Sequence, residues 1–382
     1  MPVITCIEDL RALAERRVPR MFYDYADVGS WTGSTYRANE ADFEDYLFRQ
    51  RVAVDIEKRT TRTTMIGQDV AMPVALAPVG LTGMQHADGE ILAARACQKF
   101  GVPFTLSTMS ICSIEDVAEA TGGHPFWFQL YVMRDRDFIN RLIDRAKAAN
   151  CSALMLTLDL QVLGQRHKDI KNGLSTPPKP TLGNLINLAT KPSWCWNMLG
   201  TKRRDFGNIV GHVKGVKDMG SLAEWTASQF DPSLTWKDIE WIRNRWGGKL
   251  ILKGIQDAED AKIAAGTGAD AIIVSNHGGR QLDGAQSSIH ALPEVVDAVG
   301  GRIEVHMDGG IRSGQHVLKA VALGAKGTYI GRAFIYGLGA MGEQGVATAL
   351  QVIQKELDLS MAFCGRTDIN TVGRDILMRA KK

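Results

Sequence analysis

The stretch that decides the fold is KLILKGIQDAEDAKIAAGTGADAIIVSNHGGRQLD, residues 249–283. It contains two short, almost continuous apolar runs, 249–255 and 270–276, which are typical of buried β-strands. Between them, residues 257–269 carry apolar side chains at helical spacing, start with an aspartate and end in glycines, as amphipathic helices do. The stretch therefore predicts a strand, a helix and a second strand that runs parallel to the first.

The same alternation continues through the chain from residue 70 onward. Further apolar runs occupy residues 73–78, 103–108, 126–132, 153–159, 303–310 and 327–332. Eight buried strands alternating with helices predict an α/β fold, a (β/α)8 TIM barrel. An open doubly wound sheet is the alternative, but it usually has fewer strands and needs a G-x-G-x-x-G turn, which LAPVGLTGM (76–84) does not supply.

We expect a single domain spanning residues 1–382. Residues 1–69 are predicted to form an N-terminal cap, with helices at IEDLRALAERRV (7–18) and at MFYDYADVGS (21–30), the second ending near Gly29. The barrel would occupy 70–382, with a long insertion at about 174–230 after the fourth strand. The terminal MRAKK is predicted to be a solvated tail.

The insertion has an unusual composition. Its stretch STPPKPTLGNLINLATKPSWCWNMLGTKRRDF (175–206) mixes large apolar residues and tryptophan with lysine and arginine. That mixture suits a peripheral contact with a membrane interface, through about 180–205. A lid or a subunit contact that buries the same residues is the alternative.

The overall composition excludes several classes of protein. The chain is 45% hydrophobic and 23% charged, with a net charge of +3, which is typical of a globular protein and argues against nucleic-acid binding. No apolar run is long enough for a transmembrane helix. The six cysteines have no metal-ligand spacing, so no metal site is expected, and they suit a reducing cytosol. We therefore expect a cytoplasmic protein, with the inner face of the cell membrane as the place for any peripheral contact.

Polar side chains follow almost every predicted strand. Active sites of TIM barrels lie at the carboxyl ends of the strands, so these side chains should gather in one site. In chain order the positions are Pro78, Ser107, Gln129 with Tyr131, Thr157 with Asp159, Lys253, Ser275 with His277, Asp308 to Gly310, and Gly331 with Arg332.

Four motifs carry a family resemblance. SNHGGRQLD (275–283), FWFQLYV (126–132), DGGIRSG (308–314) and IGRAF (330–334) together resemble the FMN-dependent α-hydroxy-acid oxidases and dehydrogenases. That family includes glycolate oxidase, L-lactate dehydrogenases, flavocytochrome b2 and mandelate dehydrogenase. The resemblance covers nearly the whole chain and implies a (β/α)8 barrel, FMN as cofactor, oxidation of a 2-hydroxy acid to a 2-keto acid, and a homotetramer.

The resemblance also implies roles for single residues. His277 would be the base, a role that a neutral imidazole can fill near pH 7, and Asp159 would stabilise the imidazolium. A helix N-cap is the alternative role for Asp159. Arg280 and Arg166 would bind the substrate carboxylate, for which arginine has a two-pronged geometry. Tyr25 and Tyr131 would donate hydrogen bonds to the substrate, with Tyr23 as an alternative to Tyr25. The catalytic set is then His277, Asp159, Tyr131 and Lys253.

A second group of residues would hold FMN. Lys253 would lie near N1 and O2 of the flavin, where a cation raises its electron affinity. The residues expected at the flavin ring and ribityl chain are Ala77, Pro78, Val79, Ser107, Gln129, Thr157 and Ser275. The residues expected at the phosphate are Asp308, Gly310, Arg312, Gly331 and Arg332, where glycines permit close approach of the backbone.

Two departures from the family pattern bear on the substrate and the electron acceptor. DLQVLGQRHKD (159–169) stands where many members have DTP, and Met109 replaces an aromatic residue of glycolate oxidase; both favour L-lactate over glycolate and resemble bacterial L-lactate dehydrogenases. Gly80 and the amphipathic insertion favour a quinone or cytochrome as acceptor, with an oxygen-using oxidase as the alternative.

An FMN-dependent isomerase and a non-catalytic flavin-binding protein are the other hypotheses. The isomerase would not need both arginines, and the non-catalytic protein should lack His277, Asp159 or Lys253.

Overall fold

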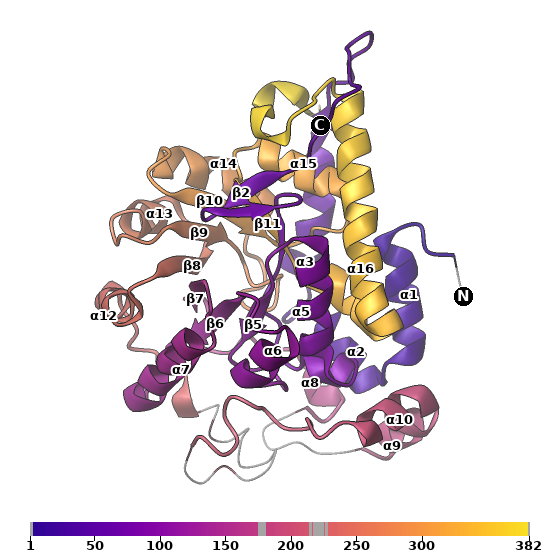
Figure 1. Ribbon diagram of the computed structural model, residues 1–382, viewed down its shortest axis with the longest axis vertical. Coiled ribbons are helices and arrows are strands. Elements are labelled where there is room, and N and C mark those ends of the chain that lie inside the picture. The colour runs from indigo at the N-terminus through magenta and orange to yellow at the C-terminus, as the bar shows by residue number, and fades with distance from the viewer. Residues whose placement is uncertain (1–2, 175–180, 214–215, 217–224, 226–227, 381–382) are drawn as a thin grey trace.

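A computed structural model describes residues 3–174, 181–213, 216, 225 and 228–380. Its centre is a sheet of eight parallel strands in the order β4-β11-β10-β9-β8-β7-β6-β5, and a bridge between Leu76 and Phe104 joins the first strand to the last (Figure 1). The strands are β4 (Val74–Leu76), β5 (Thr105–Ser107), β6 (Trp127–Tyr131), β7 (Ala153–Thr157), β8 (Lys249–Ile255), β9 (Ala271–Val274), β10 (Glu304–Asp308) and β11 (Gly327–Ile330). The sheet is therefore closed, and the predicted (β/α)8 barrel is confirmed, whereas the open sheet is excluded.

Both faces of each strand are buried, which explains the continuous apolar runs. In β7, Leu154 and Leu156 face the surrounding helices, whereas Ala153 and Met155 belong to a separate cluster that fills the barrel interior with Trp127 and its neighbours. A strand with one solvated face would instead have shown alternating polar and apolar residues.

Helices follow the strands around the barrel. They are α4 (Thr82–Gln85), α5 (Gly89–Phe100), α6 (Ile114–Ala120), α7 (Arg136–Ala148), α12 (Trp236–Trp246), α13 (Ala258–Ala264), α14 (Ser288–Val299), α15 (Gly314–Ala322) and α16 (Arg332–Phe363). Helix α13 ends at Ala264, before the predicted residue 269, and the turns that follow include Gly268, whose φ of 77° is left-handed.

The N-terminal cap contains the two predicted helices and several elements that were not predicted. Helix α1 (Ile7–Arg17) matches its prediction, whereas α2 (Arg20–Ala26) ends three residues before Gly29. The cap continues with α3 (Ser34–Ala41), η1 (Asp42–Asp45) and the antiparallel hairpin of β2 (Thr63–Met65) and β3 (Gln68–Val70). The hairpin places Met65, Ile66 and Val70 in the interior cluster of the barrel, and so covers one end of it.

The C-terminal segment is exposed but is held in a strand. After η2 (Ile369–Thr371) and η3 (Arg374–Ile376), strand β12 (Leu377–Arg379) pairs antiparallel with β1 (Tyr46–Phe48) of the cap. The prediction of a solvated, poorly ordered MRAKK tail holds for the exposed side chains of Met378 and Arg379, but it was wrong about order as far as residue 380, because the pairing supplies backbone partners; residues 381–382 lie outside the described part.

The region after β7 holds α8 (His167–Lys171), α9 (Leu182–Ala189) and α10 (Pro192–Gly200). Helices α9 and α10 form a pair that projects at one edge of the molecule (Figure 1). Arg166 is the N-cap of α8, the first helix after β7, so the alternative role of Asp159 as a helix N-cap is wrong. Within the described residues no helix is both long and apolar enough to span a membrane.

Candidate active site

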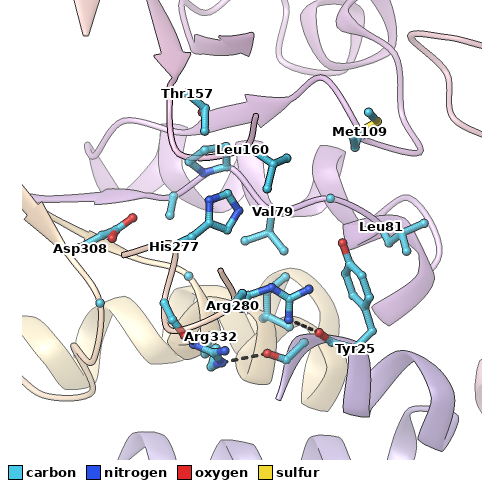
Figure 2. Close-up of a pocket in the computed structure, with 18 of the residues that line it drawn as sticks. Tyr25, Val79, Leu81, Met109, Thr157, Leu160, His277, Arg280, Asp308 and Arg332 are labelled. Carbon is cyan, nitrogen blue, oxygen red and sulfur yellow. Dashed lines mark hydrogen bonds between the residues drawn. The ribbon is translucent and has the colours of Figure 1, made fainter. Parts of the chain in front are cut away.

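One cavity of about 310 Å³ lies at the carboxyl ends of the barrel strands. Figure 2 shows His277 and Arg280, from the loop after β9, and Tyr25, from α2 of the cap, facing this space. The residues predicted for the site that line the cavity are Tyr25, Ala77, Pro78, Val79, Tyr131, Thr157, Arg166, Lys253, His277, Arg280, Asp308, Gly310, Arg312, Gly331 and Arg332. The other four, Ser107, Gln129, Asp159 and Ser275, lie behind this lining.

His277 and Asp159 form a pair at this end of the barrel. Nδ1 of His277 lies 2.9 Å from Oδ1 of Asp159. Burial alone would raise the pKa of Asp159, but the charge and hydrogen bond of His277, together with Lys253, hold it below its ordinary value. With Nδ1 engaged, Nε2 of the imidazole is the atom left for a ligand in the cavity.

The turn after β9 is left-handed at three successive residues. His277 has a φ of 59°, and Gly278 and Gly279 have φ values of 65° and 71°. A Cβ on Gly279 would lie 2.5 Å from the backbone nitrogen of Tyr36, so the turn also needs glycine for its contact with the cap. A histidine in this conformation carries strain, which is common at functional sites.

Two arginines converge on the aromatic ring of Tyr25. The guanidinium carbon of Arg280 lies 4.7 Å from the ring centroid, and that of Arg166 lies 5.5 Å from it. Nε of Arg166 forms an ion pair with Asp169 at 2.8 Å, whereas the hydrogen bonds of Arg280 go to the carbonyl oxygens of Tyr25 and Val28. Burial, together with the charge of Arg166, lowers the pKa of Arg280 to about 10. This half of the cavity therefore has an excess of positive charge that suits an anion.

Of the three candidate tyrosines, two line the cavity and one lies away from it. Tyr25 and Tyr131 line the cavity, and Tyr131 packs edge-on against Phe230, with burial raising the pKa of its phenol. Tyr23 is buried away from the cavity and donates a hydrogen bond to Asp27 at 3.1 Å. The structure therefore favours Tyr25 over Tyr23 as a residue of the site.

Lys253 is a buried cation at the inner side of the cavity. Its Nζ lies 3.0 Å from Oδ2 of Asp308 and donates to Oγ of Ser275 at 2.8 Å. Burial alone would lower the pKa of Lys253, but Asp308 and Asp159 hold it above its ordinary value. The lysine is therefore charged at neutral pH.

Three polar side chains form a chain of hydrogen bonds behind the lining. Oγ of Ser107 donates to Oε1 of Gln129 at 3.1 Å, and Nε2 of Gln129 donates to Oγ1 of Thr157 at 3.0 Å. All three are almost fully buried, and Thr157 reaches the cavity. Such a network holds its polar atoms in fixed directions.

A second pair of arginines, Arg312 and Arg332, follows β10 and β11, and Arg332 lies beside Arg280, because both donate to the carbonyl oxygen of Val28. Arg312 pairs with Glu40 at 2.6 Å, whereas the side-chain hydrogen bonds of Arg332 go to carbonyl oxygens. Burial lowers the pKa of Arg332. Gly310 has a φ of 78°, and a Cβ there would lie 1.7 Å from the carbonyl oxygen of Asn39. Only glycine fits this turn.

These features fit FMN. Arg332 has no carboxylate partner among the described residues and lies at the start of the long helix α16, which together suit a phosphate group. Oδ1 of Asp308 is buried and has no hydrogen-bond partner in the described structure, as expected of a group that awaits a ligand hydroxyl.

Several residues of the site were missed at the sequence level. Asp169, three residues after Arg166 on one helix face, is visible in the sequence as an ion-pair spacing. The apolar lining was not predicted: Leu81, Leu160, Leu163, Leu174, Phe206, Phe230, Ile311 and Ile335. Nothing in the pattern of the insertion marks Phe206 or Phe230 as a residue that turns inward.

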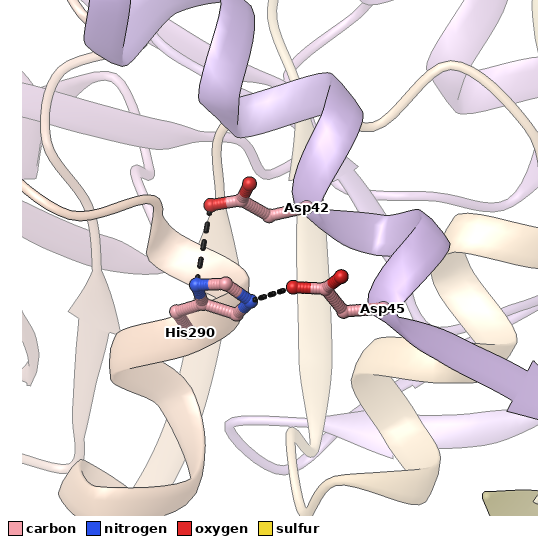
Figure 3. Close-up of side chains that lie close together, drawn as sticks. All are labelled: Asp42, Asp45 and His290. Atoms are coloured by element: carbon pink, nitrogen blue, oxygen red, sulfur yellow. Dashed lines mark hydrogen bonds and ion pairs between the residues drawn. The ribbon is translucent and has the colours of Figure 1, made fainter. Parts of the chain in front are cut away.

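A further polar group lies outside the cavity, where η1 meets α14 (Figure 3). Nδ1 of His290 lies 3.2 Å from Asp42, and Nε2 lies 3.0 Å from Asp45. Among the described residues this is the group whose ligand atoms lie close enough to hold a cation. Because each ring nitrogen faces a carboxylate, the group is explained as a link between the cap and the barrel.

Comparison with known proteins decides the family. The model of FMN-dependent dehydrogenases matches residues 14–379. The chain belongs to the FMN-dependent dehydrogenase family. The family resemblance, the FMN cofactor and the oxidoreductase class predicted from the sequence are thereby confirmed.

Relatives with assigned names are similar over their full length. The chain is 45% identical to an L-lactate dehydrogenase of Caulobacter sp. (strain K31), covering 100% of both chains, and 44% identical to one of Ectopseudomonas mendocina, covering 99% of this chain and 100% of the other. Among solved structures, the monotopic membrane protein (S)-mandelate dehydrogenase superposes with a TM-score of 0.94 at 34% identity, covering 99% and 100% of the two chains. A mandelate oxidase superposes with a TM-score of 0.84 at 34% identity, covering 99% of each chain.

Proposed function

We propose that this family member oxidises an L-2-hydroxy acid, with L-lactate as the preferred substrate, to the corresponding 2-keto acid. The observation that carries the proposal is the placement of the His277–Asp159 pair and of Arg280 in one cavity. A base and an anion site side by side are what this oxidation requires. The names of the relatives at 44–46% identity support lactate.

Substrate binding rests on charge and hydrogen bonding. Arg280 and Arg166 would hold the carboxylate of the 2-hydroxy acid, and the hydroxyls of Tyr25 and Tyr131 would bind its oxygen atoms. Arg280 contributes most of the attraction, because the charge of Arg166 is already balanced by Asp169.

The cofactor would lie along the inner wall of the cavity. Bound FMN accepts the two electrons that leave C2 of the substrate. Lys253 and the polar chain of Ser107, Gln129, Thr157 and Ser275 would hold the flavin ring and ribityl, with the backbone of residues 77–79 along one edge. The phosphate would be held by Gly310, Arg312, Gly331 and Arg332, whereas Asp308, expected at the phosphate from the sequence, would instead accept a hydrogen bond from a hydroxyl of FMN through Oδ1.

His277 would manage a substrate proton. In a carbanion route its imidazole takes the proton from C2, and in a hydride route it takes the proton from the hydroxyl. In either route the second hydrogen and the two electrons would pass to bound FMN, C2 would become a carbonyl carbon, and Asp159, at 2.9 Å, would stabilise the imidazolium. Tyr131 would hydrogen-bond the oxygen on which charge changes.

The acceptor would be a quinone or a cytochrome, met at the inner face of the cell membrane. Helices α9 and α10 expose Leu182, Leu185, Ile186, Trp196 and Leu199 by 56 to 76%. Beneath them, Met198 and Trp194 belong to an apolar cluster that also contains Leu81 and Tyr25 of the cavity. An apolar surface with tryptophan that is continuous with the cofactor site supports a lipophilic acceptor. The similarity to a monotopic membrane protein supports the same location.

A homotetramer remains part of the proposal, on the family resemblance, and light scattering of the purified protein tests it. The reaction itself is tested by anaerobic titration. L-lactate should bleach the visible flavin band, and air should restore it slowly while a quinone analogue restores it rapidly. Rapid recovery in air would instead identify an oxygen-using oxidase, and a band that persists with L-lactate would overturn lactate as the substrate.

A further inference from the structure

Gln281 joins the two loops that carry the reactive groups of the cavity. Its Nε2 donates to the carbonyl oxygens of Asp159 at 2.9 Å and Val162 at 2.7 Å, and its Oε1 accepts from the backbone nitrogen of Gly164 at 3.2 Å. One neutral side chain thus makes three hydrogen bonds to the loop after β7. Gln281 itself follows Arg280 directly in the loop after β9.

The two loops also touch through their backbones. A Cβ on Gly164 would lie 2.5 Å from the carbonyl oxygen of Arg280 and 2.9 Å from Cα of Gln281. Position 164 therefore cannot bear a side chain without moving one loop away from the other. Together with the amide bonds of Gln281, the contact fixes the separation of the loops.

Both functional pairs of the site span this junction. Asp159 lies in the loop after β7 and His277 in the loop after β9, and the same holds for Arg166 and Arg280. Strand β7 ends at residue 157 and β9 at residue 274, so the ladder of the barrel stops short of all four residues. Their mutual distances depend on contacts between the loops themselves.

We propose that Gln281 is a positioning residue, which sets the distance between the base and its carboxylate and the distance between the two arginines. It does not line the cavity, so it acts through Asp159 and Arg166 rather than on the substrate. The proposal rests on the proposed function of those residues. Errors of about 1 Å in such a geometry can slow a reaction roughly a hundredfold.

The test compares two side chains of the same turn. Gln281→Met keeps the size of the side chain and removes all three bonds. Asp283→Asn is the matched control, because Asp283 binds Thr32, Ser34 and Thr35 of the cap instead of the loop after β7. Each purified protein, with FMN bound, is mixed anaerobically with L-lactate to measure the rate of flavin reduction, and is titrated calorimetrically with propionate, which carries a carboxylate and no 2-hydroxyl.

We expect Gln281→Met to retain FMN, to reduce its flavin roughly tenfold to a hundredfold more slowly at saturating lactate, and to bind propionate more weakly. Asp283→Asn should match the wild type in both measurements.

Equal rates in Gln281→Met and the wild type would overturn the proposal, and so would an equal loss in the two variants. Where Gln281→Met loses FMN, Gln281→Glu, which keeps an acceptor for Gly164, is measured instead; loss of FMN from both would show a structural role alone and overturn the proposal. A wild type that binds propionate without reduction by lactate would count against the proposed substrate, and weaker propionate binding by Gln281→Met would then still support the positioning role.

Discussion

Nδ1 of His277 lies 2.9 Å from Oδ1 of Asp159, although the two residues are 118 positions apart in the chain. They follow strands β9 and β7, which both pair with β8, so the barrel brings their loops together. The carboxylate fixes the orientation of the imidazole by engaging its Nδ1. This relationship leaves Nε2 of His277, which lines the cavity, available for the proposed role as a base.

Replacing His277 tests the base. We expect His277→Gln to lower the rate of anaerobic flavin reduction by about a hundredfold to ten thousandfold, which is the usual contribution of a general base. FMN should stay bound, since the residues expected at the cofactor are unchanged. His290→Gln, which alters a histidine held by two carboxylates outside the cavity, should leave the rate unchanged. Reduction at the wild-type rate in His277→Gln would contradict the assignment.

The two arginines should differ in their effects. Arg280→Met should weaken propionate binding by roughly tenfold to a hundredfold, because a charge-assisted hydrogen bond contributes about 1.5–3 kcal/mol. Arg166→Met should also weaken binding, since it leaves the carboxylate of Asp169 at the cavity without its cation. The double variant Arg166→Met/Asp169→Asn should therefore bind propionate better than Arg166→Met alone. Calorimetry checks this order, and a double variant that binds no better would show that Asp169 does not act through charge.

The sequence predicted the barrel because its strands are buried on both faces and therefore stand out as apolar runs. The same argument predicted most of the polar residues that line the cavity, since strand ends of a barrel meet at one edge. The prediction failed where long-range contacts decide the structure. Strand β12 pairs with β1, although neither three-residue strand has a recognisable pattern of apolar residues. Likewise, Phe230 turns into the cavity from an insertion whose composition fits a surface equally well.

His316, a residue of α15 that contacts the backbone of Arg312, should make the free energy of unfolding depend on pH. Burial lowers the pKa of its imidazole from 6.5 to about 4, and the ring stacks on Phe43 at 4.2 Å. The unfolded chain takes up a proton more readily than the folded one, so stability should fall as the pH drops from 6.5 towards 4. The loss is at most about 3 kcal/mol, from roughly 1.4 kcal/mol per pKa unit.

Urea unfolding of the wild type and of His316→Gln at several pH values between 7 and 4.5 checks this expectation. Glutamine has no charge in this range, so the stability of the variant should fall less steeply with acidification. FMN release should follow the same dependence, because Nδ1 of His316 accepts from the backbone nitrogen of Arg312 at 3.2 Å. Parallel curves for the two proteins would mean that His316 does not titrate on unfolding.

The exposed face of α10 should carry membrane binding. Trp196 and Leu199 are 76% and 70% exposed, and burying a large apolar side chain contributes about 1.5–3 kcal/mol. The variant Trp196→Ser/Leu199→Ser should therefore bind anionic lipid vesicles at least about tenfold more weakly in a sedimentation assay. Phe363→Ser, which alters a side chain of α16 that is 62% exposed, is the matched control and should bind as the wild type does.

Flavin reduction by lactate should stay unchanged in both, whereas reoxidation by a quinone embedded in vesicles should slow in the α10 variant alone. Reoxidation by ferricyanide in solution should remain at the wild-type rate, because that acceptor needs no membrane. Unchanged vesicle binding in the α10 variant would instead favour a lid or a subunit contact for this helix pair.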